Sequence, residues 1–173
     1  MDIRFRECTV EDLPELCAFS KEVFYESFRD ACSPEDMEAF LRDRYSAGRI
    51  RDELLNPDST FCFLYLNGCL SGYIKINEAP AQTDIHDDSA LELERIYVSG
   101  KAQGKGCGSY LLEQVTGTAK QKGKEYIWLG VWEKNLKALS FYRKHGFREI
   151  GTHTFMIGAD AQTDYIMRKD LQE

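Results

Sequence analysis

Apolar residues recur with two different periods along the chain. Residues 2–6 alternate between charged and apolar side chains, which predicts an edge strand. From Leu13 to Phe28 the apolar residues return every three or four positions, the spacing of one helix face. Ser33-Pro34 restarts that pattern, since proline is tolerated in a first helical turn, and a short helix is expected over 50–55. The first third of the chain therefore predicts one strand followed by helices.

Beyond residue 59 the pattern becomes mainly that of strands. Residues 60–66 are rich in aromatic and apolar side chains, and Asn67-Gly68 is a strong hairpin signal, so a second strand is expected over 69–77. Residues 78–89 are polar and predict a loop. The remaining elements are expected as strands over 91–98, 125–132, 147–157 and 163–168, and as helices over 104–122 and 135–144. This order predicts an α/β chain without internal repeats.

Composition narrows the class of protein. The 173 residues are 43% hydrophobic and 29% charged, which suits a single domain, 1–173, with a substantial core. No apolar run is long enough for a membrane span, and Met1–Arg6 lacks the layout of a secretory signal, so we expect a cytoplasmic protein without a membrane partner. The net charge of −7 disfavours nucleic acid and favours cationic ligands.

The six cysteines do not form a metal or disulfide pattern. They stand at positions 8, 17, 32, 62, 69 and 107, with no C-x-x-C pair and no zinc-ligand spacing. We interpret most of them as small buried hydrophobes in a reducing compartment, and we expect no metal.

A turn dense in glycine follows the strand predicted over 91–98. Gly104, Gly106 and Gly108 alternate at the start of the next helix. Glycine allows positive φ and a close approach of ligand to backbone, and free N–H groups at a helix start bind phosphate. The dinucleotide pattern G-x-G-x-x-G fails at Ser109, and the P-loop pattern has no match. The alternative is a glycine-rich connection that binds no ligand. Three glycines at a helix start would weaken the helix by about 1 kcal/mol each relative to alanine, which is hard to explain without a function.

Gln103-Gly104-Lys105-Gly106-Cys107-Gly108 resembles the R/Q-x-x-G-x-G/A signature of the GNAT superfamily of N-acetyltransferases. The resemblance implies a mixed, mostly antiparallel sheet of about seven strands with helices on both faces, and acetyl-CoA as cosubstrate. It assigns binding of the CoA pyrophosphate to the amides of Gln103, Gly104, Lys105, Gly106, Cys107, Gly108 and Ser109, and pairing with pantetheine to the strand Ile96, Tyr97 and Val98. Cys107 is expected to pack rather than to act as a nucleophile.

A second segment, 135–147, resembles the family block N-x-x-A-x-x-F-Y-x-K/R-x-G-F. Asn135 and Tyr142 are two helical turns apart and share a face. The resemblance implies that Asn135 contacts pantetheine and that Tyr142 lies near the thioester sulfur. Taken alone, Tyr142 would be interpreted as a half-buried core aromatic. Lys144 is a candidate for the CoA phosphates, and a solvated cation at the helix end is an equal alternative.

Acetyl transfer needs a neutral amine, whereas a free alkylamine has a pKa of about 10. Glu92 and Glu94 are two apart on one strand and point to the same face. We take Glu94 as the candidate base, and pairing with Arg95 or a lysine as an equally good interpretation. Tyr142 is the candidate acid for the departing thiolate, and a backbone N–H near Val98 could stabilise the oxyanion.

The whole chain also resembles the branch of PaiA-type spermidine/spermine N-acetyltransferases, through segments that include 91–97, 127–135 and 162–164. That resemblance implies a polyamine substrate and direct attack in a ternary complex. The acidic loop with Asp84, Asp87 and Asp88 and the aromatics Tyr25 and Phe28 are compatible with it, although solvation and core packing explain them as well. Other amines, a non-catalytic acetyl-CoA-binding regulator and another phosphate-binding module stay open. We expect a monomer or homodimer.

Overall fold

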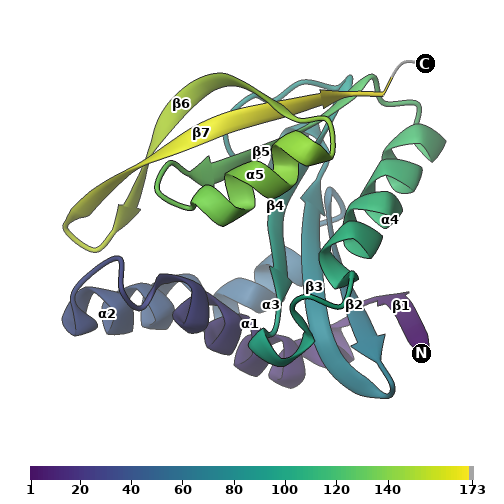
Figure 1. Cartoon of the computed structure of the whole chain (residues 1–173). Coiled ribbons are helices and arrows are strands. Elements are labelled where there is room, and N and C mark those ends of the chain that lie inside the picture. The colour runs from purple at the N-terminus through teal and green to yellow at the C-terminus, as the bar shows by residue number, and fades with distance from the viewer. Residues whose placement is uncertain (172–173) are drawn as a thin grey trace.

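The computed structural model, which describes residues 1–171, has seven strands in one sheet, ordered β1-β2-β3-β4-β5-β7-β6 (Figure 1). Six helices or strands precede the first long loop: β1 (Ile3–Glu7), α1 (Leu13–Phe28), α2 (Pro34–Arg44), α3 (Ala47–Leu55), β2 (Ser59–Leu66) and β3 (Cys69–Asn77). Six more follow it: β4 (Ala90–Val98), α4 (Cys107–Gln121), β5 (Tyr126–Trp132), α5 (Leu136–Lys144), β6 (Arg148–Ile157) and β7 (Asp160–Asp170). The predicted mixed sheet of about seven strands is confirmed.

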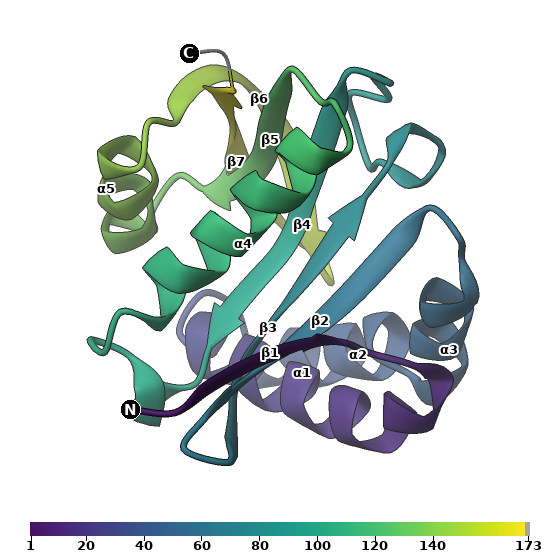
Figure 2. The ribbon, with the colours of Figure 1, turned by 90° about the vertical axis from the view of Figure 1, so that its right-hand side faces the viewer.

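Helices cover both faces of the sheet (Figure 2). Alternate residues of β2 show how the sequence makes two layers: Leu64 packs toward α4 and α5, whereas Phe63 packs toward α1, α2 and α3. Successive side chains of a strand point to opposite faces, and because both faces of β2 are covered, the strand is apolar almost throughout. The core therefore has two parts, separated by the sheet.

Strands β4 and β5 run parallel but pair only briefly. Ala90–Glu92 pairs with Tyr126–Trp128, and beyond this point the two strands separate although both continue, β4 to Val98 and β5 to Trp132. The other described strand pairs are antiparallel. The separation leaves the facing edges of β4 and β5 without strand partners in the middle of the sheet.

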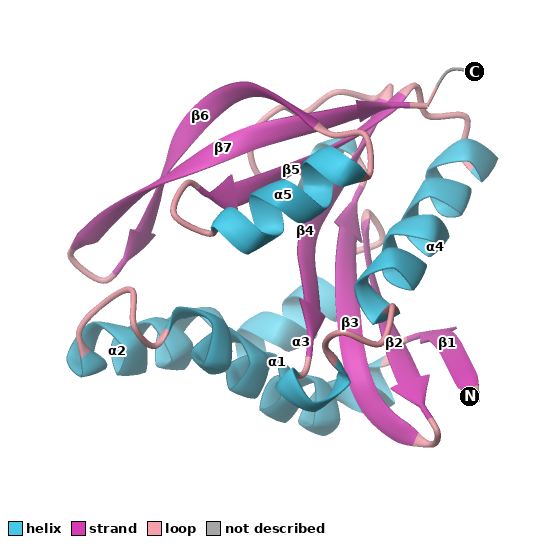
Figure 3. Ribbon diagram, viewed as in Figure 1, coloured by secondary structure: helices cyan, strands magenta, loops and turns pink. Residues whose placement is uncertain are grey.

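Three elements begin three residues away from the predicted position. Helix α3 begins at Ala47 and not at Ile50, because the Ser46 hydroxyl accepts a hydrogen bond from the Arg49 N–H and caps the helix there. Helix α4 begins at Cys107 and not at Gly104, because Gly104 and Gly106 have φ of 76° and 82°, which is incompatible with a right-handed helix. Strand β7 is longer than predicted because it pairs with β5 and with β6, and the long β6–β7 hairpin reaches over α2 (Figure 3). Across residues 1–171, none of the helices combines the length and the apolar character of a membrane span.

Candidate active site

The glycine turn leaves the start of α4 open to an anion. Gly106 precedes the helix in the left-handed conformation, and no side chain caps the helix start. The Tyr110 N–H donates to the Gly106 carbonyl oxygen at 3.0 Å. The N–H groups of Cys107, Gly108 and Ser109 precede it and have no intrahelical acceptor. Free N–H groups and the helix dipole together favour a bound phosphate at this point.

The same turn fixes α4 against α5. A Cβ on Gly108 would lie 3.1 Å from the Phe141 ring, so only glycine allows this approach without a shift of the ring. Ser109 Oγ lies 3.1 Å from His145 Nε2, which ties the first turn of α4 to the end of α5. Cys107 is buried in the core, the position expected for a packing residue. The two predicted motifs are therefore in direct contact.

A cavity of about 240 Å³ opens where β4 and β5 separate. Seven residues that the sequence assigned to the cofactor or to catalysis line it: Glu94, Ile96, Tyr97, Val98, Gln103, Asn135 and Tyr142. Asn135 also caps α5, since its Oδ1 accepts a hydrogen bond from the Ala138 N–H at 3.1 Å. Lys105 and Lys144 are exposed. We refer to this cavity as the groove.

Tyr142 stands in the wall of the groove with its ring packed on Phe141 and Phe147. Its hydroxyl has no hydrogen-bond partner within residues 1–171. Burial raises the pKa of this phenol well above its ordinary value, so the group keeps its proton at neutral pH. A protonated, unengaged hydroxyl in a cavity wall suits a proton donor.

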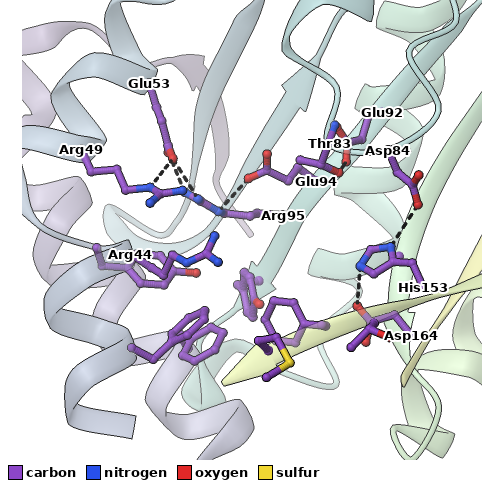
Figure 4. Close-up of a pocket in the computed structure, with 18 of the residues that line it drawn as sticks. Arg44, Arg49, Glu53, Thr83, Asp84, Glu92, Glu94, Arg95, His153 and Asp164 are labelled. Atoms are coloured by element: carbon purple, nitrogen blue, oxygen red, sulfur yellow. Dashed lines mark hydrogen bonds and ion pairs between the residues drawn. The ribbon is translucent and has the colours of Figure 1, made fainter. Parts of the chain in front are cut away.

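A larger cavity, of about 520 Å³, lies on the α1–α3 side of the sheet and is called here the acceptor cavity (Figure 4). Its charged lining comprises Arg44, Arg49, Glu53, Asp84, Glu92, Glu94, Arg95 and Asp164, together with His153. Five residues line both this cavity and the groove: Glu94, Tyr97, Gly130, Phe155 and Asp164. The two cavities therefore meet at these residues, which we call the junction.

Glu94 reaches the junction as a member of a buried ion network. Its carboxylate accepts hydrogen bonds from Lys75 Nζ at 3.0 Å and lies 3.1 Å from Arg95 Nε, and Glu53 pairs with both cations from α3. Burial alone would raise the pKa of Glu94, but Arg95 and Lys75 outweigh it and the pKa is lowered. Lys75 pairs with Arg95 and Ile76 with Leu93, so Glu94 is the extra residue of a bulge in β4. The bulge turns Arg95 into the cavity, which regular alternation did not predict.

Glu92 anchors the loop over 78–89. It accepts hydrogen bonds from the Thr83 N–H at 2.9 Å, from Thr83 Oγ1 at 2.5 Å and from Asn77 Nδ2 at 2.9 Å. Burial raises the pKa of Glu92. With its oxygens occupied, this carboxylate holds the wall of the acceptor cavity in place.

Three neighbouring residues lie at or beside the junction: Asp84, His153 and Asp164. The sequence offered Asp84 only as part of an acidic loop compatible with a polycation, and it assigned no role to His153 or Asp164. His153 Nδ1 lies 3.2 Å from Asp84 Oδ2, and His153 Nε2 lies 3.9 Å from Asp164 Oδ2 (Figure 4). Burial raises the pKa of Asp164 to about 6, with His153 opposing the rise. The segment 162–164 supported the family resemblance, but a polar residue in an alternating strand is normally taken as solvent-facing.

Of the other residues that the sequence offered for binding the amine, some line the cavities and some lie at the surface. Phe28 lines the groove, with its ring 6.0 Å from that of Trp132, whereas Tyr25 is largely exposed. Of the acidic loop, Asp84 faces the acceptor cavity, while Asp87 accepts a hydrogen bond from the Tyr126 hydroxyl at 2.6 Å. In the described part of the chain, no group of three or more His, Cys, Asp or Glu residues is arranged to hold a metal ion.

Comparison with known proteins gives a consistent picture. The family model described as Acetyltransferase (GNAT) family matches residues 21–147. An uncharacterised N-acetyltransferase of Lactobacillus delbrueckii subsp. lactis is 36% identical over 169 residues, which cover 98% of each chain. A spermidine N(1)-acetyltransferase of Thermoplasma acidophilum is 27% identical, again over 98% of each chain.

A solved structure gives the same result in three dimensions. The crystal structure of PaiA N-acetyltransferase from Thermoplasma acidophilum in complex with coenzyme A superposes with a TM-score of 0.80. The match covers 98% of this chain and 99% of that one, at 27% identity. The fold of the whole chain therefore has a counterpart that was crystallised with coenzyme A.

Proposed function

The chain belongs to the acetyltransferase (GNAT) family of N-acetyltransferases, which use acetyl-CoA, and on this premise we propose that its acetyl acceptor is a polyamine such as spermidine or spermine. The observation that carries the proposal is the acceptor cavity, which joins the groove at a carboxylate-rich junction. The 27% identical spermidine N(1)-acetyltransferase supports the same substrate class.

Acetyl-CoA fits the groove by the chemistry of its parts. The pyrophosphate would be held at the glycine turn by the amides of residues 103–109, among which those of Cys107, Gly108 and Ser109 have no intrahelical acceptor. The Gln103 N–H already donates to the Ser99 carbonyl oxygen at 3.1 Å. The pantetheine amides would extend along residues 96–98, at the free edge of β4, with Asn135 across the groove. When bound, acetyl-CoA supplies the thioester that the amine attacks, without a covalent enzyme intermediate.

Tyr142 is our candidate for the acid that protonates the departing CoA thiolate. It lines the groove, its hydroxyl is unengaged within the described chain, and its raised pKa keeps it protonated. Glu94, the base candidate from the sequence, borders both cavities but is held by Lys75 and Arg95 at a lowered pKa. In this proposal Glu94 supplies fixed negative charge for the ammonium group and positions Arg95.

The charge of the acceptor cavity favours a polycation near the junction. Five carboxylates line the cavity against three arginines. Three of the five have no arginine or lysine partner among the described residues: Glu92, whose oxygens accept hydrogen bonds from Thr83 and Asn77, and Asp84 and Asp164, which lie beside His153 on the β6–β7 side. Carboxylates in a concave, partly desolvated site attract ammonium groups. A linear polyamine would place one amine at the junction and the next along the cavity.

One observation favours a second candidate substrate. Arg44, at the end of α2, lines the acceptor cavity with its guanidinium 5.7 Å from the Phe40 ring centre, and it forms no ion pair with any described residue. A cation at this place would repel a distal ammonium group and attract a carboxylate. An amine that also carries a carboxylate, such as a short peptide, would place its ammonium group at the junction and its carboxylate beside Arg44.

A thiol-release assay with acetyl-CoA tests the choice against polyamines, aminoglycosides and peptides. We expect the highest kcat/KM with spermidine or spermine, and we expect Arg44→Glu to raise it further. Arg42→Glu, on the same helix and outside the cavity lining, is the matched control. If the wild-type protein acetylates peptides alone and Arg44→Glu loses that activity, the second candidate substrate replaces the polyamine. Normal CoA binding without any acetylated amine would favour a regulator.

A further inference from the structure

Asp164 occupies the junction because three strands place it there. Asp164 lies in β7, where it pairs with Trp132 of β5 on one side and with His153 of β6 on the other. Cross-strand partners project from the same face, so the carboxylate stands between these two side chains. Gly130 leaves the space in front of it open, since a Cβ there would lie 3.6 Å from Asp164 Oδ2. Asp164 thus faces the point where groove and acceptor cavity meet.

This carboxylate is buried without the partners that buried charge needs. The Asp164 side chain is 12% exposed, and its Oδ1 is buried with no hydrogen-bond partner in the described chain. No lysine or arginine nitrogen of residues 1–171 lies within 4.0 Å, and His153 is its ion-pairing neighbour. Glu92 and Glu94 differ, since each accepts several hydrogen bonds. A buried carboxylate oxygen that faces a cavity calls for a cationic ligand.

We propose that the Asp164 carboxylate binds the substrate's ammonium group beside the thioester and accepts the proton that this group must lose before attack. The inference rests on the proposed acetylation of an amine, whichever amine that is. His153, set between Asp164 and Asp84, then passes the proton toward the solvent-exposed edge of the cavity.

The protons balance over the reaction. The ammonium group gives one proton to Asp164, and the neutral amine forms the C–N bond at the thioester carbon. Collapse of the tetrahedral adduct breaks the C–S bond. The second nitrogen proton is lost as the amide forms, while Tyr142 protonates the CoA sulfur and regains a proton from that nitrogen. The first proton leaves through His153, so the products are the amide, the free thiol and one released proton.

The surroundings suit a proton acceptor that works near neutral pH. Burial raises the pKa of Asp164 to about 6, much closer to neutrality than an ordinary carboxylate. The titratable or charged groups that face the junction are His153 on β6, Asp84 on the loop, and Tyr97 and Glu94 on β4. Burial raises the pKa of Tyr97 well above its ordinary value, and Arg95 and Lys75 keep Glu94 ionised, so neither group competes with Asp164 for the proton near neutral pH.

The experiment compares wild type with Asp164→Asn on two kinds of amine. With an alkylamine that is an ammonium ion at pH 7, the variant is expected to lose about 100-fold or more in kcat. With trifluoroethylamine, which is largely neutral at pH 7, no proton acceptor is needed for the first step, so the two proteins are expected to differ by less than about threefold in kcat/KM. A purely structural role would lower both activities alike.

Asp160→Asn, on the same strand at an exposed position, is the matched control and should behave as wild type with both amines. The acidic limb of the wild-type pH profile of kcat/KM should vanish in Asp164→Asn. If the variant does not fold, carbon-13 NMR of the wild-type carboxyl groups replaces it, with an Asp164 pKa below 4.5 counting against the inference.

The outcomes separate the two proposals. Unchanged kcat in Asp164→Asn, or an equal loss with both amines, would overturn the role of Asp164 while leaving amine acetylation intact. A wild-type protein that binds CoA but acetylates no amine would remove the proposed function itself.

Discussion

The Asp164 carboxylate should reduce the stability of the folded chain at neutral pH, which can be tested without substrate. We expect Asp164→Asn to raise the free energy of unfolding, because it replaces a buried charge that has no lysine or arginine partner within residues 1–171 with a neutral group of the same shape. The carboxylate has a pKa of about 6 in the folded chain, compared with its ordinary value of 3.8. At about 1.36 kcal/mol per pH unit, this difference corresponds to about 3 kcal/mol.

The gain should be smaller than this figure, because the Asn carbonyl still lacks a partner. We therefore expect about 1–3 kcal/mol, which in a chain of this length corresponds to roughly 3–10 °C in Tm. Thermal unfolding without ligand gives the measurement, with Asp160→Asn as the exposed control on the same strand.

The sign of the pH dependence makes the test specific. The folded chain binds the Asp164 proton more tightly than the unfolded chain, so wild type loses stability as pH rises from about 4 to about 6. The variant has no such group. The difference in Tm should thus be near zero below pH 4, grow through this window and stay constant above pH 7. A destabilised variant, or a difference that does not change between pH 4 and pH 8, would refute the reasoning.

Three further changes test other parts of the site. Tyr142→Phe should keep CoA affinity and slow turnover at least tenfold, since it removes the hydroxyl and keeps the ring packing. Calorimetric titration measures the CoA affinity and steady-state kinetics the turnover, and unchanged turnover would exclude the acid role. Gly106→Ala should raise the Kd for CoA and cost about 1 kcal/mol of stability, because φ is 82°; Gly117→Ala, inside α4 with open space around it, should slightly stabilise and leave the Kd unchanged. Lys75→Met should cost about 3–5 kcal/mol in urea unfolding, since it leaves the Glu53 and Glu94 carboxylates facing each other without this cation; a loss below 1 kcal/mol would show that Arg95 alone suffices.

Most of the fold could be predicted because local pattern and packing agree. The helical spacing over Leu13–Phe28, the Asn67-Gly68 turn and the apolar strand Ser59–Leu66 each appear in the structure as elements of the expected type. Alternation along β2 divides its side chains between two layers, which is what a sheet covered on both faces requires.

The separation of β4 from β5 could not be predicted from the local pattern of apolar and polar residues. Both strands keep apolar character beyond Glu92 and Trp128, so their sequences do not show where pairing stops. The bulge that turns Arg95 into the acceptor cavity is equally invisible, because alternation places it on the opposite face from Glu94. Both features depend on neighbouring strands and on the helices packed over them.

The two cavities differ in how directly the sequence encodes them, and this explains which site residues were found. The groove uses main-chain groups, and the glycines that expose them lie within a few positions of one another, so a short motif is enough. The acceptor cavity takes side chains from α1, α2, α3, the 78–89 loop, β4, β5, β6 and β7. The role of each side chain depends on residues far along the chain: Lys75 fixes Glu94, whereas no lysine or arginine of the described residues pairs with Asp164. In our proposal Asp164 acts as a base because the fold of the described chain places no lysine, arginine or hydrogen-bond donor beside its Oδ1, and only the assembled structure shows that these partners are missing.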